Sequence, residues 1–363
     1  MGRLSSIGLH VVLVAIVVFW PVAASAAQSA TPLASPTTGS SDAPLPVTFP
    51  GDDGPHETTT EWWYYTGHLF SAKGDRYGFE FVIFKGDRGG VAGYASHFAV
   101  TDGQAGRFQY DQRVALAAGV SRPGEGFDLT LDDWSMRGAD GEDALRATLP
   151  DYAIDLELTS TKPPALHDGD GYFAYGDGTA SYYYSRTRIA VTGMLMVRGE
   201  PISVTGEAWM DHQWGDFATY AGGGWDWFAV QFADDTDLML YVIRDKTGAP
   251  VQAYGSLIDR AGELTALGGS EFAVTPTGSW TSPATGTTYP SGWRVTVAAA
   301  SLSVTLSPVL ADQELDTRAT TGVIYWEGEV EVDGTRAGAP VAGLGYVELT
   351  GYAPFSPPST PGI

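Results

Sequence analysis

Cysteine is absent from the 363 residues of this chain, and basic residues are few. The absence of cysteine excludes disulfides, thiolate metal ligands, cysteine nucleophiles and a lipidated N-terminal cysteine. The 20 Lys and Arg residues are outnumbered by 43 Asp and Glu residues, so the formal net charge is −23. Because nucleic acids bind to basic surfaces, this balance excludes them as partners.

Long apolar runs are also missing, apart from one near the N-terminus. The run from Ile7 to Trp20 follows Arg3 and precedes a small-residue pattern that ends at Ala26. This order predicts a signal peptide over residues 1–26 and a secreted or extracytoplasmic protein. A retained anchor is the alternative, but the run is shorter than the roughly 20 residues of a spanning helix. We therefore expect no integral membrane span once the leader is removed.

The segment after the leader has the composition of a linker. Residues 27–48 are mostly Ser, Thr, Pro and Ala, with almost no large apolar side chain. Such a segment cannot bury enough apolar surface to offset its loss of conformational entropy. We predict a disordered linker that ends where the folded part begins, near residue 49.

The rest of the chain has the pattern of short strands. It is 44% hydrophobic and 12% aromatic over the whole sequence, with 46 Gly and 22 Pro residues that punctuate apolar runs of five to eight residues. The segments 127–131 and 154–158 alternate strictly between apolar and polar residues, as strands with one solvated face do. No segment sustains a helical period, so the pattern predicts an all-β protein.

A weak internal duplication divides the folded part. The aromatic run 62–65 is followed by the apolar run 79–84, and in the second half 225–228 is followed by 238–243. A repeat of this kind indicates two copies of one domain. We predict two tandem antiparallel β-barrels, over residues 49–218 and 219–355, followed by a tail at 356–363.

The two copies differ at one informative place. When 206–212 is aligned with 343–349, Asp211 and His212 fall opposite Glu348 and Leu349. The side chain that titrates near neutral pH is therefore missing from the second copy. If one barrel is catalytic, we expect it to be the first.

His212 lies in the densest cluster of chemically capable residues, at 209–216. Strand alternation places His212 and Trp214 on one face, and Trp209 and Asp211 on the other. A histidine beside an aromatic face suits proton transfer next to an apolar or cationic centre, with Asp211 in a supporting position. The alternative is a core histidine that is satisfied by the backbone.

A second cluster begins with a carboxylate at the head of an aromatic run. In strand alternation Glu61, Trp63 and Tyr65 share one face. Glu80 is similarly enclosed, between two phenylalanines. A carboxylic acid in an apolar cavity has a raised pKa and becomes a usable proton donor. The alternative is that the aromatic run only fills a barrel core.

The remaining histidines offer a metal site as an alternative. His97 is a further candidate for the site, and with His68 and His212 it would complete a three-histidine zinc site. The spacings are long and no local ligand pair exists, so we expect no metal and no cofactor. His167 lies in a loop rich in Pro, Asp and Gly and is expected to be solvated.

The tyrosine run 181–188 supplies a further candidate and two charged residues. Tyr183 is expected to reach a polar end of a ligand inside the barrel. Because cations are scarce, Arg186 or Arg188 is expected to pair with one of the candidate carboxylates.

Eight motifs together make the chain resemble a known family of lipocalin-like secreted proteins, the AttH and carotenoid 1,2-hydratase (hydroxyneurosporene synthase, CrtC) family. The resemblance implies two lipocalin-like barrels and an apolar cavity. It leaves the activity open, because the family includes carotenoid and kievitone hydratases, relatives linked to cycloadditions and predicted secreted hydrolases. The family's His-x-Trp pair matches His212 and Trp214, whereas its Tyr-x-Asp pattern meets Tyr241 and Ile243 and lacks the Asp. The motifs are 61–69, 97–100, 182–188, 206–215, 224–228, 312–315, 325–328 and 345–352.

These observations lead to one interpretation with two alternatives. We expect a secreted lipocalin-like protein that binds a hydrophobic, isoprenoid- or lipid-like molecule and acts as a hydratase or hydrolase. The alternatives are a non-catalytic carrier and a carbohydrate-binding protein, the latter with Trp225 and Trp227 on an open face. The candidate catalytic residues are His212, Glu61, Asp211 and Glu80, and the candidate substrate-binding residues are Trp63, Trp214, Tyr65, His97, Tyr183 and Trp209.

Overall fold

The fold is all-β, as predicted. A computed structural model describes residues 44–357 except 89–90, 117–124, 176–177 and 218–222. The predicted signal peptide, most of the linker, the domain boundary at 218/219 and the end of the tail lie outside the described residues. Within them, the helical elements are two single 3-10 turns, η1 (Gly51–Asp53) and η2 (His167–Gly169). No helix in this part of the chain has the length and apolarity needed to cross a membrane.

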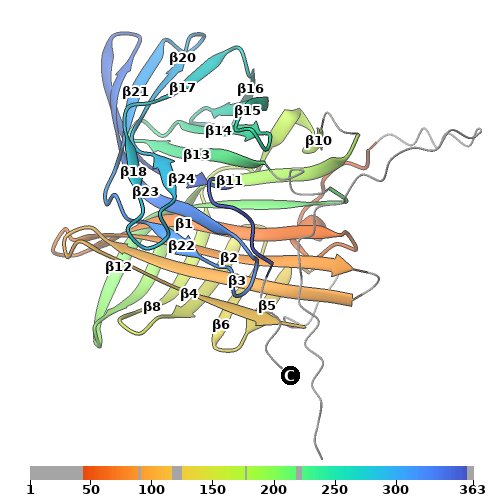
Figure 1. The fold of residues 1–363 in the computed structure, drawn as a ribbon, viewed down its shortest axis with the longest axis vertical. Helices are drawn as coiled ribbons and strands as arrows, with labels where there is room; N and C mark the ends of the chain where they lie inside the picture. The colour runs from red at the N-terminus through yellow and green to blue at the C-terminus, as the bar shows by residue number, and fades with distance from the viewer. Residues whose placement is uncertain (1–43, 89–90, 117–124, 176–177, 218–222, 358–363) are drawn as a thin grey trace, which may run out of the picture.

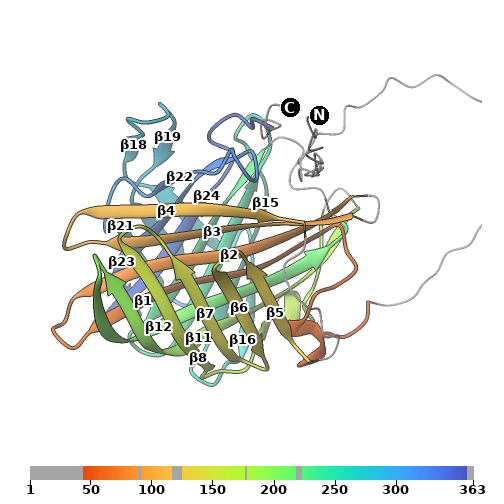
Figure 2. The same cartoon turned by 90° about the horizontal axis from the view of Figure 1, so that it is seen from below.

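The first half forms one strongly curved antiparallel sheet, which Figure 2 shows wrapping around a common interior. Its strand order is β4-β3-β2-β1-β12-β11-β8-β7-β6-β5. The strands are β1 (Thr60–Ser71), β2 (Arg76–Arg88), β3 (Val91–Asp102), β4 (Arg107–Ala115), β5 (Phe127–Leu131), β6 (Trp134–Ala139), β7 (Glu142–Thr148), β8 (Tyr152–Ser160), β11 (Ala180–Val197) and β12 (Glu200–Gly215), with the short β9 (Ala165–Leu166) and β10 (Tyr172–Ala174) paired to β11.

The second half repeats this arrangement in a second curled sheet. Its order is β16-β15-β14-β13-β24-β23-β21-β20-β17, with β22 paired to β23 and a separate hairpin of β18 and β19. The strands are β13 (Gly224–Phe232), β14 (Asp237–Arg244), β15 (Pro250–Ile258), β16 (Leu264–Gly268), β17 (Phe272–Pro276), β18 (Ser279–Thr281), β19 (Thr288–Pro290), β20 (Trp293–Val297), β21 (Leu302–Pro308), β22 (Glu314–Asp316), β23 (Ile324–Arg336) and β24 (Ala339–Leu349).

Strand register agrees with the duplication seen in the sequence. β1 lies between β2 and β12, and β13 lies between β14 and β24 in the same way. His212 is opposite Trp63 in the first sheet, and Leu349 is opposite Asp226 in the second. The prediction of two similar barrels is therefore confirmed, and Figure 1 shows them stacked, the first in orange to green and the second in cyan to blue.

Strand alternation divides β1 between two environments. Trp63 and Tyr65 point into the first barrel and are fully buried in its core. Trp62 and Tyr64 point the other way, into a second aromatic cluster that also contains Trp227 of the second barrel. One strand thus supplies both the barrel interior and the contact between barrels, because successive side chains leave opposite faces.

The contact between the barrels is rich in buried polar groups. His167 is fully buried there, although the sequence predicted a solvated loop residue. Its Nε2 lies 2.7 Å from Ser185 Oγ, and its Nδ1 lies 2.8 Å from Ser256 Oγ of the second barrel. The prediction was wrong because the second barrel, which is remote in sequence, covers the loop.

Ion pairs also differ from the expected ones. The Arg188 Nη2 group donates to Asp237 Oδ1 at 2.8 Å, and Lys162 Nζ donates to Asp237 Oδ2 at 2.7 Å, so the second barrel is joined to the first. Arg186 donates to Asp53 Oδ1 at 3.0 Å in the first barrel. Neither arginine forms an ion pair with Glu61, Glu80 or Asp211 among the described residues.

Burial of His167 predicts a pH-dependent contribution to stability. Burial lowers the pKa of His167 from 6.5 to about 3, so below pH 6.5 the unfolded chain binds a proton that the folded chain does not. Its stabilising contribution is therefore present above pH 6.5 and lost as the pH falls. For His167→Gln, the loss of unfolding free energy between about pH 7.5 and about pH 5 should be smaller than in the wild type by about 2 kcal/mol. Urea denaturation at both pH values measures this difference, and equal losses in the two proteins would contradict it.

Candidate functional site

The centre of the candidate site is Glu61, a fully buried carboxylate at the start of β1. Its Oε1 lies 2.8 Å from His56 Nδ1 and 3.0 Å from His212 Nε2. The backbone N–H of His56 donates to both carboxylate oxygens, at 3.1 and 3.0 Å. Lys85 Nζ on β2 donates to Oε2 at 3.2 Å. A buried carboxylate needs such donors to offset the loss of hydration, and Glu61 has them on all sides.

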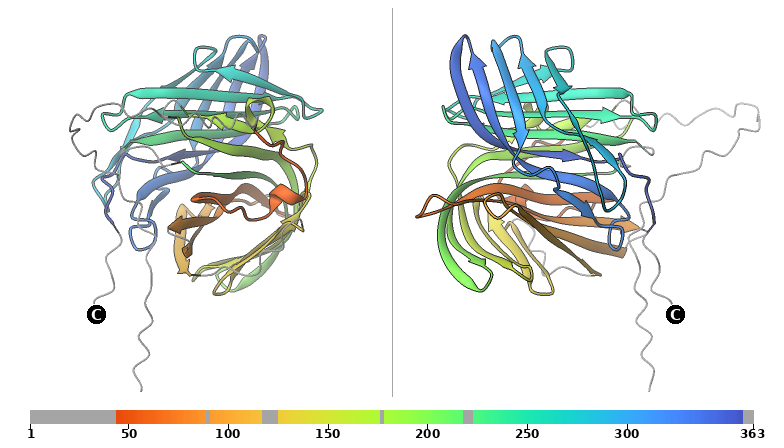
Figure 3. Two further views of the ribbon diagram at one scale, coloured as in Figure 1. Left: turned by 90° about the vertical axis from the view of Figure 1, so that its right-hand side faces the viewer. Right: turned by 60° about the vertical axis from the view of Figure 1, so that its left-hand side comes forward.

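The segment before β1 is fastened over the first barrel, and this brings His56 to Glu61. Asp53, at the end of η1, accepts hydrogen bonds from the Tyr184 hydroxyl at 2.6 Å and from Arg186 at 3.0 Å. Its carbonyl accepts a hydrogen bond from Trp63 Nε1 at 2.9 Å. Figure 3 shows this orange turn lying against the barrel. His56 follows three residues later and is therefore held at the barrel rim, with its side chain 19% exposed.

Aromatic rings enclose the two imidazoles. The His212 ring stacks on Trp63 with centroids 4.8 Å apart and lies 4.7 Å from Trp214. The His56 ring lies parallel to Trp214 at 4.0 Å. The structure thus brings together four of the candidates from the sequence analysis, namely Glu61, Trp63, His212 and Trp214. It adds His56, which the sequence analysis did not select.

Protonation at this centre differs from the expectation for Glu61. Burial by itself would raise the pKa of Glu61, but the hydrogen bonds and charges of His212 and His56 outweigh it and hold the pKa at about 2. Glu61 is therefore ionised at neutral pH and is no proton donor. The sequence could not show this, because the opposing groups come from β12 and from the segment before β1.

Glu61 also determines the tautomer of His212. Burial lowers the pKa of His212, while the hydrogen bond to Glu61 opposes that shift. In the neutral ring, Nε2 carries the proton that is donated to Glu61, so Nδ1 is the basic nitrogen. Nδ1 lies 3.3 Å from the Tyr184 hydroxyl, which donates its proton to Asp53. A carboxylate that orients a histidine in this way prepares it to act as a general base.

Asp211 lies outside this centre, with two other candidates. It points toward the second barrel and accepts hydrogen bonds from the Tyr183 hydroxyl and from Trp209 Nε1, each at 2.6 Å. Burial raises the pKa of Asp211 to about 6, against the opposing effect of the hydrogen bonds it accepts. The side chains of Asp211, Tyr183 and Trp209 therefore form one polar cluster between the barrels, while those of the described residues that bond to the His212 ring are Glu61 and Tyr184.

Glu80 and His97 also face the second barrel. Burial and the charge of Glu348 raise the pKa of Glu80 well above its ordinary value, and the Tyr325 hydroxyl donates to it at 3.3 Å. The same hydroxyl lies 2.8 Å from His97 Nδ1, and burial lowers the pKa of His97 to about 3. The surroundings of Glu80 thus favour its neutral form, as the sequence suggested, but Glu80 is on the opposite face of the sheet from His212.

The three-histidine zinc site considered above is not formed. His97 is bound to residues of the second barrel, and His68 Nδ1 lies 3.0 Å from Glu329 on β23. The ligand atoms that do converge are those of His56, Glu61 and His212, which lie within 4.8 Å of one another and could hold a metal ion. A metal ion there would have to replace the hydrogen bonds between Glu61 and both rings beside the Lys85 ammonium, so we describe the set as a hydrogen-bonded network.

Tyr65 connects the barrel interior to a carboxyl that the sequence analysis missed. Its hydroxyl donates to Asp143 Oδ2 at 2.9 Å. Burial raises the pKa of Asp143 to about 7, although the hydrogen bond from Tyr65 acts in the opposite direction and lowers it. Nothing in the local sequence marks Asp143. Its burial depends on its partner on the neighbouring strand, Gly138, because a Cβ atom at that position would collide with the Asp143 carboxylate.

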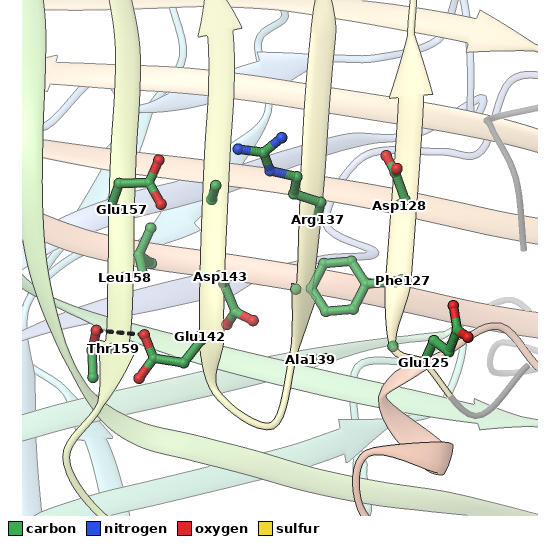
Figure 4. A pocket seen from close by; sticks show the side chains of 13 residues that line it. Glu125, Phe127, Asp128, Arg137, Ala139, Glu142, Asp143, Glu157, Leu158 and Thr159 are labelled. Atoms are coloured by element: carbon green, nitrogen blue, oxygen red, sulfur yellow. Dashed lines mark hydrogen bonds between the residues drawn. The ribbon is translucent and has the colours of Figure 1, made fainter. Parts of the chain in front are cut away.

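Asp143 also lines an open hollow of about 330 Å³ on the wall formed by β5 to β8 (Figure 4). The other charged residues around the hollow are all exposed, namely Glu125, Asp128, Arg137, Glu142 and Glu157. This hollow is acidic and polar. It is therefore different from the apolar cavity that the family resemblance implied, and that cavity stays a prediction.

The two tryptophans that a carbohydrate-binding surface would require are not on an open face. Trp227 is 5% exposed and packs against Tyr64 at 5.3 Å between ring centroids. Trp225 Nε1 donates to Glu348 at 2.7 Å. Both belong to the aromatic cluster between the barrels, so this alternative has no support from their positions.

The equivalent place in the second barrel lacks the groups of the site. Gly224 occupies the position of Glu61, opposite Arg244 as Glu61 is opposite Lys85. Leu349 occupies the position of His212. Arg244 instead pairs with Asp226 at 3.1 Å, so the cation is neutralised without a histidine.

Comparisons with known proteins agree with this architecture. The sequence profile of a family described as AttH-like matches residues 40–352. A solved protein of Nitrosomonas europaea described as AttH is 34% identical over 88% of this chain and 100% of its own, with a TM-score of 0.77. Kievitone hydratase from Nectria haematococca is 18% identical over 90% of this chain and 98% of its own, with a TM-score of 0.67. CghA is 13% identical over 86% of this chain and 94% of its own, with a TM-score of 0.55.

The last two similarities show the fold alone, because the identities are low. No curated protein matches the chain.

The bond between Glu61 and His212 predicts the titration of His212. In Glu61→Gln the interaction that raises the pKa of His212 is lost, while the burial that lowers it remains. The pKa of His212 should therefore be lower in the variant than in the wild type, and the wild-type ring should carry its proton on Nε2. ¹⁵N chemical shifts of the histidine ring nitrogens, followed through a pH titration, measure both properties. An unchanged or higher pKa in the variant would show that Glu61 does not support the base.

Proposed function

The chain belongs to the AttH-like family, and from this premise we propose that it is a hydratase-like enzyme acting on a hydrophobic, isoprenoid- or lipid-like small molecule in its first barrel. The observation that carries the proposal is the buried pair of Glu61 and His212, 3.0 Å apart between aromatic rings. Structural and binding proteins have little need for an ionised carboxylate that orients a neutral histidine in an aromatic enclosure.

The pair supplies the base that hydration requires. His212 Nδ1 takes a proton from water as the water oxygen attacks the carbocation formed from an alkene. The Glu61 carboxylate stabilises the imidazolium that results, since it already accepts the proton on Nε2. The faces of Trp63 and Trp214 stabilise the positive charge on the substrate.

The acid must be a different group, because Glu61 is ionised. Asp143 suits this role, since its pKa of about 7 leaves a protonated fraction at neutral pH. Tyr65, whose hydroxyl donates to Asp143, lies on the same face of β1 as Glu61. In this mechanism Asp143 protonates the alkene and His212 deprotonates the water.

Two further observations support the proposal. Kievitone hydratase has the same fold over 90% of this chain, although the low identity carries no residue roles. The leader pattern at residues 1–26 supports export, so we propose a secreted or extracytoplasmic enzyme.

The test is hydration of apolar compounds by the purified protein. The protein is incubated with an apolar extract of the source cells, and organic extracts are compared by mass spectrometry for products heavier by one water. The intact protein should form such a product. His212→Asn and Glu61→Gln should reduce the rate by about 100-fold or more, because each removes the base or its orientation.

Glu314→Gln is the matched control for the loss of a buried carboxylate. Glu314 is 7% exposed, lies in the second barrel and accepts hydrogen bonds from Ser282 and Tyr289. It should keep the wild-type rate. A compound retained unchanged by the wild type and by His212→Asn would instead identify a carrier, and a wild-type rate in His212→Asn would remove His212 from the mechanism.

A further inference from the structure

His212 and its aromatic neighbours are covered in this structure. His212 and Trp63 are 0% exposed, and Trp214 is 4% exposed. A substrate can therefore reach the proposed base only when a part of the molecule that covers these rings moves. The part that suits such a movement lies before β1, because it belongs to neither sheet.

We propose that residues 45–53, here called the plug, occupy the substrate site of the first barrel in the resting protein. The ligand that replaces the plug is an apolar molecule with a carboxylate, and this carboxylate takes the place of Asp53. The proposal deepens the function proposed above and rests on His212 being the base of that reaction. It names the class of substrate and the place where the substrate binds.

The apolar part of the site is filled by two side chains of the plug. Val47 and Phe49 are partly buried and pack against the core of the first barrel. The Phe49 ring meets the Tyr184 ring edge-on, with centroids 4.9 Å apart, and the Tyr184 hydroxyl lies 3.3 Å from His212 Nδ1. An apolar ligand in the place of Phe49 therefore lies against a residue that contacts the base.

The polar part of the site is a set of donors around the Asp53 carboxylate. Oδ1 accepts hydrogen bonds from the Tyr184 hydroxyl at 2.6 Å and from Arg186 at 3.0 Å. Oδ2 accepts hydrogen bonds from the backbone N–H of Asp140 at 2.6 Å and from Arg186 at 3.3 Å. Asp53 is 1% exposed and Arg186 is 3% exposed. This is a buried carboxylate-binding site, and its occupant is a side chain of the same protein.

These donors determine which ligand can replace the plug. When Asp53 leaves, a neutral ligand would leave the buried Arg186 charge without the carboxylate that it bonds, which is costly. A ligand carboxylate restores the bonds to Arg186, Tyr184 and the backbone N–H. An apolar carboxylic acid therefore matches both parts of the plug, the Phe49 ring and the Asp53 side chain.

The plug is attached in a way that permits this exchange. Its described backbone–backbone hydrogen bonds are local, such as the bond from the Asp52 N–H to the Thr48 carbonyl at 2.8 Å. Its bonds to the barrel run through side chains, among them the bond from Trp63 Nε1 to the Asp53 carbonyl at 2.9 Å. Displacement of the plug thus breaks no strand pairing, and it uncovers Trp63 beside His212. His56 lies outside the plug and keeps its place.

Binding of octanoate to the purified protein, measured by isothermal titration calorimetry, tests the site. 1-Octanol has the same chain without the charge. Asp53→Asn and Phe49→Ala should each bind octanoate about tenfold or more tightly than the wild type, because each weakens the internal competitor. In the Asp53→Asn background, Arg186→Gln should weaken octanoate binding by about tenfold or more and leave 1-octanol binding unchanged. An octanoate affinity that is unchanged or lower in both plug variants would overturn the proposal.

Asp226→Asn is the matched control. Asp226 accepts hydrogen bonds from Arg244 at 3.1 Å and from the Tyr352 hydroxyl at 3.0 Å, so the change removes the same kinds of bond in the second barrel. This variant should bind octanoate as the wild type does. An equal gain of affinity in Asp226→Asn and Asp53→Asn would indicate general loosening and refute the plug. If circular dichroism shows that Asp53→Asn is unfolded, Phe49→Ala decides the outcome alone.

Release of the plug can be followed directly. Because the chain has no cysteine, Thr48→Cys places a single nitroxide label at an exposed position of the plug. Octanoate should narrow the lines of the electron paramagnetic resonance spectrum, and 1-octanol at the same concentration should narrow them less. An unchanged spectrum with octanoate bound would put the ligand elsewhere and contradict the proposal.

These measurements need no turnover, so they separate the site from the proposed function. If octanoate displaces the plug but no hydrated product is ever found, the hydratase fails and the carboxylate site stands. If hydration is found only for compounds without a carboxylate, and the plug variants do not gain affinity, the hydratase stands and the carboxylate site fails.

Discussion

The first barrel depends on one buried carboxylate. Glu61 is bound by groups from three separate segments, namely His56 before β1, Lys85 on β2 and His212 on β12. An ionised carboxylate inside a barrel is costly unless it is fully hydrogen-bonded, so these segments must meet in one arrangement. The same bonds hold the segment before β1 against the barrel, keep Glu61 ionised and orient His212. Structure and proposed chemistry therefore depend on the same contacts.

Alternation along β1 and β12 gives the two faces of one sheet different tasks. His212 and Trp214 face the barrel interior, while Asp211 and Trp209 face the second barrel. Adjacent residues thus belong to separate networks, one proposed for catalysis and one that joins the barrels. In the second barrel Glu348 occupies the position of Asp211 on the face between the barrels. On the other face Leu349 occupies the position of His212, so the histidine is absent there. This pattern is what duplication followed by specialisation of one copy would produce.

Sequence reasoning reached some of the site and missed the rest for identifiable reasons. Glu61 and His212 were accessible because each stands in an aromatic strand whose alternation shows which neighbours share its face. His56 was missed because it lies in an irregular segment without periodicity. Asp143 was missed because its burial comes from Gly138 on the adjacent strand. Glu80 was placed in the site because enclosure by phenylalanines shows burial and does not show which face is buried.

By itself the sequence determined the all-β class, the two barrels and the absence of the histidine from the second copy, because strand periodicity and internal similarity are local properties of the chain. Only the tertiary structure decided which candidates meet. It placed Glu61 between two imidazoles, which lower its pKa, and buried Glu80 near the charge of Glu348 from the other barrel, so that the pKa of Glu80 is raised. The protonation state of a buried carboxylate is set by the groups that surround it in space, and these come from segments far apart in the chain.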